Sequence, residues 1–202
     1  MRRSLWFSPV DPPHDQLFQG DVIIKCKVFT YYPDRKQVEQ QTVSHAVVLN
    51  QTCDLRHRDL KNVLVTPAWQ VHEFLPKHPD KRIRQTFDME IQTEDDFINW
   101  LKNTSKSKRN SVVAKLEEIR KRRIHHLCLL GPSKHWRMLI VDFRNLFVVQ
   151  RDIVLENARN NGLFRLEPPY REYLSHSFGH YFTRIALPEQ SGDVKAWLGI
   201  QG

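Results

Sequence analysis

The sequence predicts an α+β protein of one domain, in which a mainly antiparallel β-barrel carries a basic two-helix insertion and a C-terminal helix. Two short aliphatic runs beside turn residues carry most of this prediction, at 20–24 and 46–55. Runs of four or five aliphatic residues between Gly, Asp and Asn are typical of buried strands, since helices need longer periodic stretches. A length of 202 residues fits one domain with a substantial core and is short for two.

An irregular lead-in over residues 1–19 is expected first, because prolines interrupt it, and Trp6, Phe7 and Phe18 would hold it against the body. The barrel is expected to use residues 20–71 and 126–158. Turn chemistry at Pro33-Asp34 predicts a hairpin near its start. The expected elements here are strands over 21–30, 37–43 and 44–51, a loop or short helical turn over 53–61, and a strand over 62–66 that Pro67 stops.

A helical insertion is predicted over residues 93–123. Helical spacing of apolar residues starts past Val71 and is broken at 76–79 by two prolines. Thr93 can cap a helix, and the acidic residues after it suit the positive helix end. Ser111 is the expected cap of a second helix, whose apolar stripe would be Val112, Val113, Leu116 and Ile119.

Strands are expected to return after the insertion, over 126–130, 137–141 and 143–149. A helix from Gln150 to Asn160 should end at Asn161-Gly162, because glycine favours helix C-termini. A C-terminal helix is predicted over 168–187, since two prolines suit its first turn and Pro188 ends it. Its core stripe would consist of Leu174, Phe178, Tyr181, Phe182 and Ile185.

The positive charge is concentrated in the predicted insertion. The chain has a net charge of +8, and residues 102–123 hold nine basic residues against two glutamates, which gives +7. A concentrated positive field favours phosphate-bearing partners, so RNA is the expected ligand. A solvated helical hairpin is the alternative interpretation. The basic residues expected to bind RNA are Lys106, Lys108, Arg109, Arg120, Lys121, Arg122 and Arg123.

Composition argues for a cytoplasmic protein with reduced thiols. No apolar run approaches the roughly 20 residues that a membrane span needs, and the N-terminus has no secretory pattern. Three widely spaced cysteines without a Cys-x-x-Cys pair do not form a disulfide framework or a zinc-finger pattern. No metal, other cofactor or membrane partner is therefore predicted.

The order of these elements resembles the MazF/PemK family. The resemblance rests on Gly20-Asp21-Val22, on Ala46-Val47-Val48-Leu49 with the polar loop after it, and on the Val-Leu-Val-Thr-Pro run at 63–67. It covers 20–67 and more weakly 136–158, about half of the chain. Family membership would imply an SH3-like barrel, and many members are RNA-cleaving toxins that act without a metal. An antitoxin or another protein partner is thus a second expected partner.

Two family positions differ in this chain. Ser44 and His45 stand where the family usually has an Arg-Pro pair, and Trp69 stands where many members have Thr or Ser. A substitute set is predicted around the loop after Leu49, since RNA cleavage needs a base, an acid and a cation. His45 or His57 would act as base or acid, Arg56 would stabilise the phosphate and Asp54 would orient them. The simpler alternative is that Asp54 shapes a turn while Arg56 and His57 face water.

Cys53 and the C-terminal helix supply further candidates. Cys53 with His57 four residues on could be a nucleophile, but packing in the core or loop is the simpler expectation. On the helix, one face would carry Tyr173, His176, Ser177, His180 and Arg184. Residues expected to contact phosphates there are Arg171, His176, His180 and Arg184. The alternative is a helix that simply packs on the barrel.

The sequence therefore predicts an RNA-binding module of the MazF/PemK type, and metal-independent endoribonuclease toxin activity is a further expectation from the resemblance. A non-catalytic protein-interaction module of a bacterial regulatory or defence system is the alternative, which the missing family arginine favours. Gly179, in the middle of the C-terminal helix, indicates close approach by another backbone or by a ligand.

Overall fold

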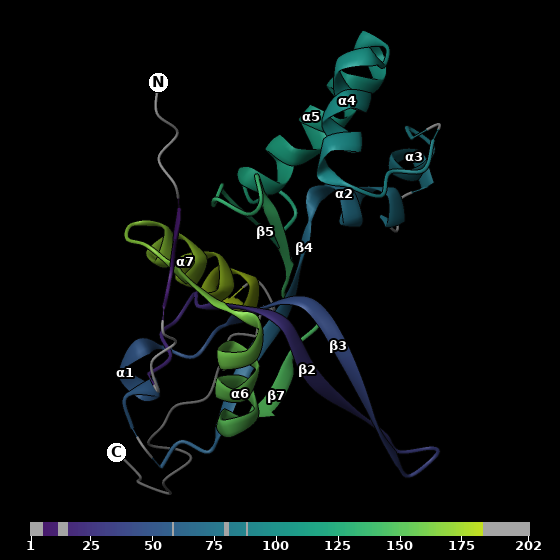
Figure 1. Ribbon diagram of the computed structural model, residues 1–202. Helices are drawn as coiled ribbons and strands as arrows, with labels where there is room; N and C mark the ends of the chain where they lie inside the picture. The colour runs from purple at the N-terminus through teal and green to yellow at the C-terminus, as the bar shows by residue number, and fades with distance from the viewer. Residues whose placement is uncertain (1–5, 12–15, 58, 79–80, 88, 184–202) are drawn as a thin grey trace, which may run out of the picture.

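The computed structural model describes residues 6–11, 16–57, 59–78, 81–87 and 89–183. It contains one eight-stranded antiparallel sheet with helices on it, so the α+β prediction is confirmed. The order is β1-β8-β2-β3-β4-β6-β5, and β7 pairs with β4 beside β6 (Figure 1). Among the described residues no pairing joins β1 to β5, so the described sheet is open. The strands are β1 (Phe7–Pro9), β2 (Val22–Tyr32), β3 (Gln37–Val48), β4 (Asn62–Gln70), β5 (Leu127–Leu130), β6 (Leu139–Asp142), β7 (Phe147–Gln150) and β8 (Leu163–Leu166).

Three strand predictions are wrong. The segments predicted as 37–43 and 44–51 are joined in the single strand β3, which ends at Val48, and β4 runs through Pro67 to Gln70. The strand predicted over 143–149 begins only at Phe147, after a turn. Proline is tolerated in a strand where its missing N–H faces no partner. One edge of β4 pairs with β3 at Pro67, while the other edge pairs with β7 up to Val65 and with β6 from Ala68. Pro67 thus lies in the gap between β7 and β6.

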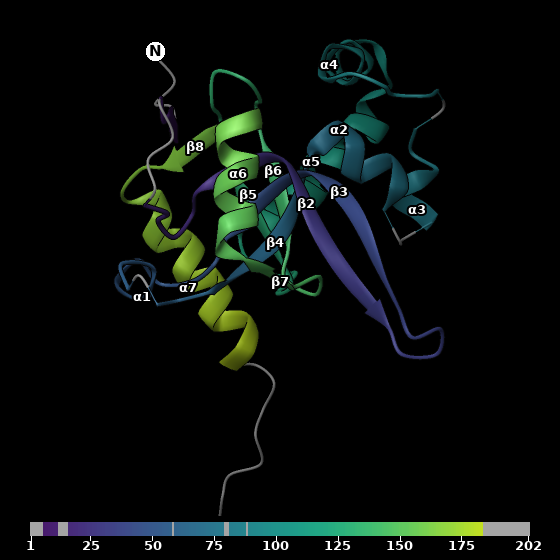
Figure 2. The same ribbon diagram turned by 60° about the horizontal axis from the view of Figure 1, so that its bottom comes forward.

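The outer half of the β2–β3 hairpin projects from the body in both views (Figures 1 and 2). Only the inner ends of these strands pair with β8 and β4. At the outer end Tyr31 lies opposite Val38, and both side chains are more than half exposed. An apolar cross-strand pair is therefore presented to solvent far along the hairpin.

The lead-in and the segment after Gly162 contain two strands that the sequence did not reveal. β1 is three residues long and pairs with β8, which is four residues long. Both are too short to show an alternating pattern. The expected aromatic anchoring is present, since Trp6 stacks on Tyr170 with ring centroids 4.0 Å apart and Phe7 is buried.

The helices follow the predicted order, with one wrong cap. Thr93 caps the first insertion helix through the Asp96 amide, as expected. Ser111 lies inside the second helix, whose cap is Ser105, which accepts from the Lys108 amide at 3.3 Å. No helix in the described part of the chain is long and apolar enough to cross a membrane. The helices are α1 (Thr52–Leu55), α2 (Val71–Phe74), η1 (Leu75–Lys77), α3 (Lys81–Arg84), α4 (Glu94–Asn103), α5 (Lys106–Arg120), α6 (Arg151–Asn161) and α7 (Tyr170–Thr183).

Three apolar clusters hold the molecule together. One lies between the sheet and α7, around Leu139, Phe143 and Leu174. A second lies between the sheet and α6, which ends at Gly162 as predicted. The third cluster packs the helices from α2 through α5 against β5 and β6, so apolar contacts hold the basic insertion to the sheet. Figure 2 shows these helices at the β5–β6 end of the sheet. The basic helices are thereby fixed on the end of the sheet that α7 also approaches.

Candidate functional site

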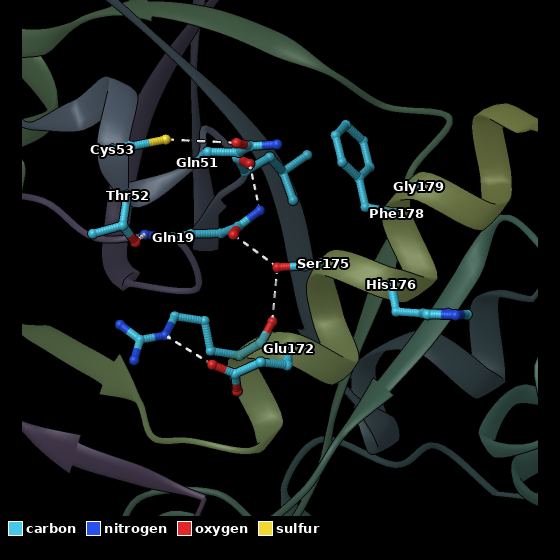
Figure 3. Close-up of a pocket in the computed structure, with 11 residues that line it drawn as sticks. Gln19, Gln51, Thr52, Cys53, Glu172, Ser175, His176, Phe178 and Gly179 are labelled. Atoms are coloured by element: carbon cyan, nitrogen blue, oxygen red, sulfur yellow. Dashed lines mark hydrogen bonds and ion pairs between the residues drawn. The ribbon is translucent and has the colours of Figure 1, made fainter.

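A pocket of about 710 Å³ lies between the segment after β3 and helix α7. The β3 side contributes Leu49 and residues 51–53, and α7 contributes its face from Arg171 to Gly179 (Figure 3). Ligand sites commonly have volumes of roughly 300–1,000 Å³ and combine apolar surface with a few polar groups. The size and mixed lining of this pocket are typical of such sites.

Gln19 fixes both walls of the pocket. Its side-chain amide donates to the Leu49 carbonyl at 3.0 Å and accepts from the Ser175 hydroxyl at 2.7 Å. Its backbone N–H donates to the Thr52 hydroxyl at 3.3 Å. Figure 3 shows Gln19 between Thr52 and Ser175. This one side chain therefore ties the end of β3, the start of α1 and helix α7 to each other.

The basic end of α5 contacts α7 next to the pocket. Arg122 donates from Nη1 to His176 Nδ1 at 2.6 Å, and its guanidinium lies 4.8 Å from the centre of the Tyr173 ring. Tyr173 donates from its hydroxyl to the Arg120 carbonyl at 3.1 Å. A guanidinium has only donors, so His176 accepts at Nδ1 in this contact. His176 also lines the pocket, so it connects the basic insertion with the cavity.

The four predicted catalytic residues do not form one group. Asp54, Arg56 and His57 are exposed on and after α1, where the Asp54 carbonyl accepts from the His57 amide at 3.1 Å. His45 is buried within β3, opposite Ala68 of β4, and packs edge-on against Trp136. The prediction that His45 shares a loop with the other three is wrong, because its side of β3 faces the core. Arg56 and His57 face water, as the simpler alternative expects, whereas the carboxylate of Asp54 accepts from the Cys53 thiol at 3.7 Å and the turn bond uses the backbone carbonyl of Asp54.

His45 is the basis of a pH prediction. Burial lowers the pKa of His45, and Glu73 opposes this shift. A histidine with a lowered pKa stabilises the fold when neutral, and that contribution is lost as the pH falls below the ordinary value of about 6.5. We therefore expect the melting temperature to fall between pH 7 and pH 5, and to fall less in His45→Phe. Burial also lowers the pKa of His126, so part of the fall should persist in the variant. An identical fall in both proteins would contradict the assignment to His45.

The basic residues predicted to bind RNA lie at two separate ends of α5. Lys106, Lys108 and Arg109 occupy its first turn, whereas residues 120–123 lie at its C-terminal end. At 1.5 Å per residue these groups are about 20 Å apart. The second group contacts α7, which carries the predicted residues Arg171, His176 and His180. His180 lies near His125, with ring centroids 5.7 Å apart, and Arg184 lies outside the described residues.

The faces of α7 differ from prediction in two places. Ser177, expected on the functional face, is buried and donates to the Tyr173 carbonyl at 2.8 Å. Phe182, expected in the core stripe, is 43% exposed, while Leu174 is fully buried. Ile185 lies outside the described residues. The buried stripe is therefore displaced toward Ser177.

The three cysteines are free, and only Cys53 is exposed. Burial raises the pKa of Cys26 and of Cys128 to about 12, which keeps both as unreactive thiols. Cys53 lines the pocket, so the core half of its expected packing role is wrong. Its contact with Gln51 Oε1 at 3.5 Å lies within the loop, as the other half of that expectation has it. Within the described ranges, no group of three potential metal-ligating side chains comes together.

The sequence did not single out the polar residues that build the pocket. Gln19 and Ser175 are ordinary polar residues in the lead-in and in α7, and their contact spans 156 positions of the chain. Gln51 belongs to the loop after Leu49 that the sequence predicts to be catalytic, but only the structure shows that Gln51 itself lines the pocket. No local motif marks any of the three.

No protein-family model, no curated protein and no solved structure matches this chain. The resemblance to the MazF/PemK family therefore stays a prediction.

Proposed function

We propose that this protein is an RNA-binding module, in which the C-terminal end of α5 and the exposed side of α7 hold the phosphate backbone beside the pocket. We also propose that its open sheet is a divergent form of the SH3-like barrel of MazF/PemK proteins. The contact of Arg122 with His176 and Tyr173 is the observation that carries the proposed function. It joins the most basic part of the chain to aromatic and imidazole groups at the rim of a cavity.

Single-stranded RNA is the form of ligand that this arrangement favours. Proteins that hold single strands combine a positive groove with aromatic side chains on which bases stack. Here Arg120, Lys121, Arg122 and Arg123 supply the charge, and Tyr173 and Phe178 supply partly buried rings. A cation such as Arg171 inside the pocket suits a phosphate.

Cleavage by the four-residue set is not part of the proposal. General acid–base catalysis requires groups within hydrogen-bond reach of one reacting unit. His45 is buried against Trp136, away from the exposed turn that holds Arg56 and His57. Binding therefore receives more support than cleavage.

The proposed function predicts a steep salt dependence of RNA binding. If about four phosphates are neutralised, log affinity should fall with log salt at a slope near −3, roughly fiftyfold from 50 to 200 mM. Fluorescence anisotropy with a labelled single-stranded 12-mer measures this slope. A double-stranded RNA of equal length is the matched control and is expected to bind more weakly, because its bases are not available for stacking.

No binding to the single strand at 50 mM salt would contradict the proposed function. That result would favour the alternative of a protein-interaction module. The exposed Tyr31 and Val38 on the projecting hairpin are the observation that supports this second candidate, since exposed apolar patches commonly mark protein contacts.

A further inference from the structure

We infer that the pocket between residues 49–53 and α7 is a nucleotide site, which takes one aromatic base together with its phosphate. The inference deepens the proposed function and rests on it for the source of the ligand, which is either one unit of an RNA strand or a free mononucleotide. The first observation behind this inference is a glycine inside helix α7, Gly179.

Gly179 lies in the interior of α7 and lines the pocket. Glycine destabilises a helix interior relative to alanine, because it loses more backbone freedom on folding. Close packing often explains such a glycine, and the sequence predicted a close approach here. However, a Cβ at Gly179 would meet no atom within 4 Å outside its own helical backbone and chain neighbours. Among the described residues, no group fills the space beside Gly179, which is exposed and lines the pocket.

The groups around Gly179 define the chemistry of a ligand. Phe178 offers a partly exposed ring beside it, and Gln51 faces α7 from the opposite wall (Figure 3). An aromatic ring suits stacking with a base, and a side-chain amide can both donate to and accept from a base edge. Arg171 adds a permanent cation at the same cavity. Its Nε lies 3.8 Å from the carboxylate of Glu172, which also lines the pocket (Figure 3), so a phosphate would have to displace this exposed carboxylate to reach the guanidinium.

The walls are preorganised for such a ligand. The amide of Gln19 is held by Leu49 on one side and by Ser175 on the other, so both walls are fixed before a ligand enters. A fixed site loses less entropy on binding than a flexible one. The pocket volume of about 710 Å³ accommodates a mononucleotide.

Gly179→Ala is the first test, because it should separate binding from folding. The melting temperature should rise by about 2–4 °C, because alanine loses less backbone freedom than glycine when the helix folds. The affinity for AMP, GMP, CMP and UMP, measured by calorimetry, should fall at least tenfold for the nucleotide that binds best. Asn160→Ala, at an exposed site on α6, is the control that should also stabilise a helix but leave affinity unchanged.

Arg171→Gln tests the phosphate contact. The wild-type protein should prefer a mononucleotide over the same nucleoside by about ten- to hundredfold, the range of a charge-assisted hydrogen bond. The variant should lose this preference and keep its affinity for the nucleoside. Lys61→Gln removes one exposed charge outside the pocket lining and should keep the preference.

The outcomes distinguish the inference from the proposed function. If the single-stranded 12-mer binds and mononucleotides compete for it, RNA is a source of the ligand and both hold. If mononucleotides bind but RNA does not, the pocket inference holds with a free ligand and the proposed function fails. If RNA binds while mononucleotides do not compete and Gly179→Ala changes nothing, the pocket inference is overturned. No binding of either ligand overturns both.

Discussion

Replacement of Arg165 by alanine is expected to lower the free energy of unfolding by about 3–5 kcal/mol, because it leaves a buried carboxylate without its counter-charge. Asp21 is completely buried at the start of β2. Arg165 of β8 donates to both of its oxygens, at 2.9 Å and 3.0 Å, and lies 3.8 Å over the Phe18 ring. In the variant, the Phe18 amide is the remaining hydrogen-bond donor to the Asp21 carboxylate among the described residues. Chemical denaturation measures the loss.

The loss should depend on pH in a defined direction. Burial raises the pKa of Asp21, and Arg165 opposes this shift. Without Arg165 the buried carboxyl favours its protonated form, so the stability deficit should be smallest at acid pH and grow as the pH rises above the ordinary carboxyl range. Denaturation of the variant at pH 4.5 and at pH 7 tests the sign.

Arg35→Ala is a matched control for Arg165→Ala. Arg35 also pairs with carboxylates, Asp34 and Glu39, and also lies over an aromatic ring, that of Tyr32. Its partners are exposed, so the expected loss is below about 1 kcal/mol. Equal losses in the two variants would contradict a special role for the buried pair. If Arg165→Ala does not fold, the double variant Asp21→Asn with Arg165→Met, which removes both charges, should recover a folded protein.

Reversal of three charges at the C-terminal end of α5 is expected to weaken binding of single-stranded RNA about a hundredfold at low salt. The variant changes Lys121, Arg122 and Arg123 to glutamate. The salt slope should become shallower by about 2, since three phosphate contacts of about 0.7 each are lost. Anisotropy titrations at several salt concentrations give both quantities, and thermal denaturation shows whether the fold is kept.

The same charge change at the other end of α5 provides the control. Lys106, Lys108 and Arg109 lie about 20 Å from the pocket end of the helix and do not contact α7 through any of the hydrogen bonds described above. Their change to glutamate gives the same net charge and should reduce affinity much less. If both triple variants lose affinity equally, RNA would respond to net charge alone, and the proposed position of the binding surface would be wrong.

Local signals in the sequence predicted their elements well. Thr93 with Asp96 marks a helix start and Gly162 marks a helix end. Both are capping signals that depend only on residues within one helical turn. Ser111 was misleading because it also precedes an apolar stripe, although the helix had already begun at the polar residues after Ser105. Pro67 was misleading because whether proline ends a strand depends on what lies at the neighbouring edge.

Long-range features of the site could not be predicted in the same way. The candidate loop after Leu49 does reach the pocket, through Gln51, Thr52 and Cys53. His45 lies only a few residues earlier, but the inner end of β3 is buried on both faces, so its side chain is enclosed in the core. Arg122 and His176 are 54 positions apart, and their meeting depends on how the insertion packs on the sheet. Composition could identify the basic segment but not which end of it meets α7.

The hydrogen bond between Gln19 and Ser175 has a consequence for the time at which the site forms during synthesis. One wall of the cavity is translated early and the other only with residues 170–183. While α7 is still inside the ribosome, the nascent chain can form most of its sheet, but the pocket lacks one of its walls. The proposed ligand binding is therefore expected to require nearly all of the described chain, and a product truncated before α7 should bind no ligand at this pocket.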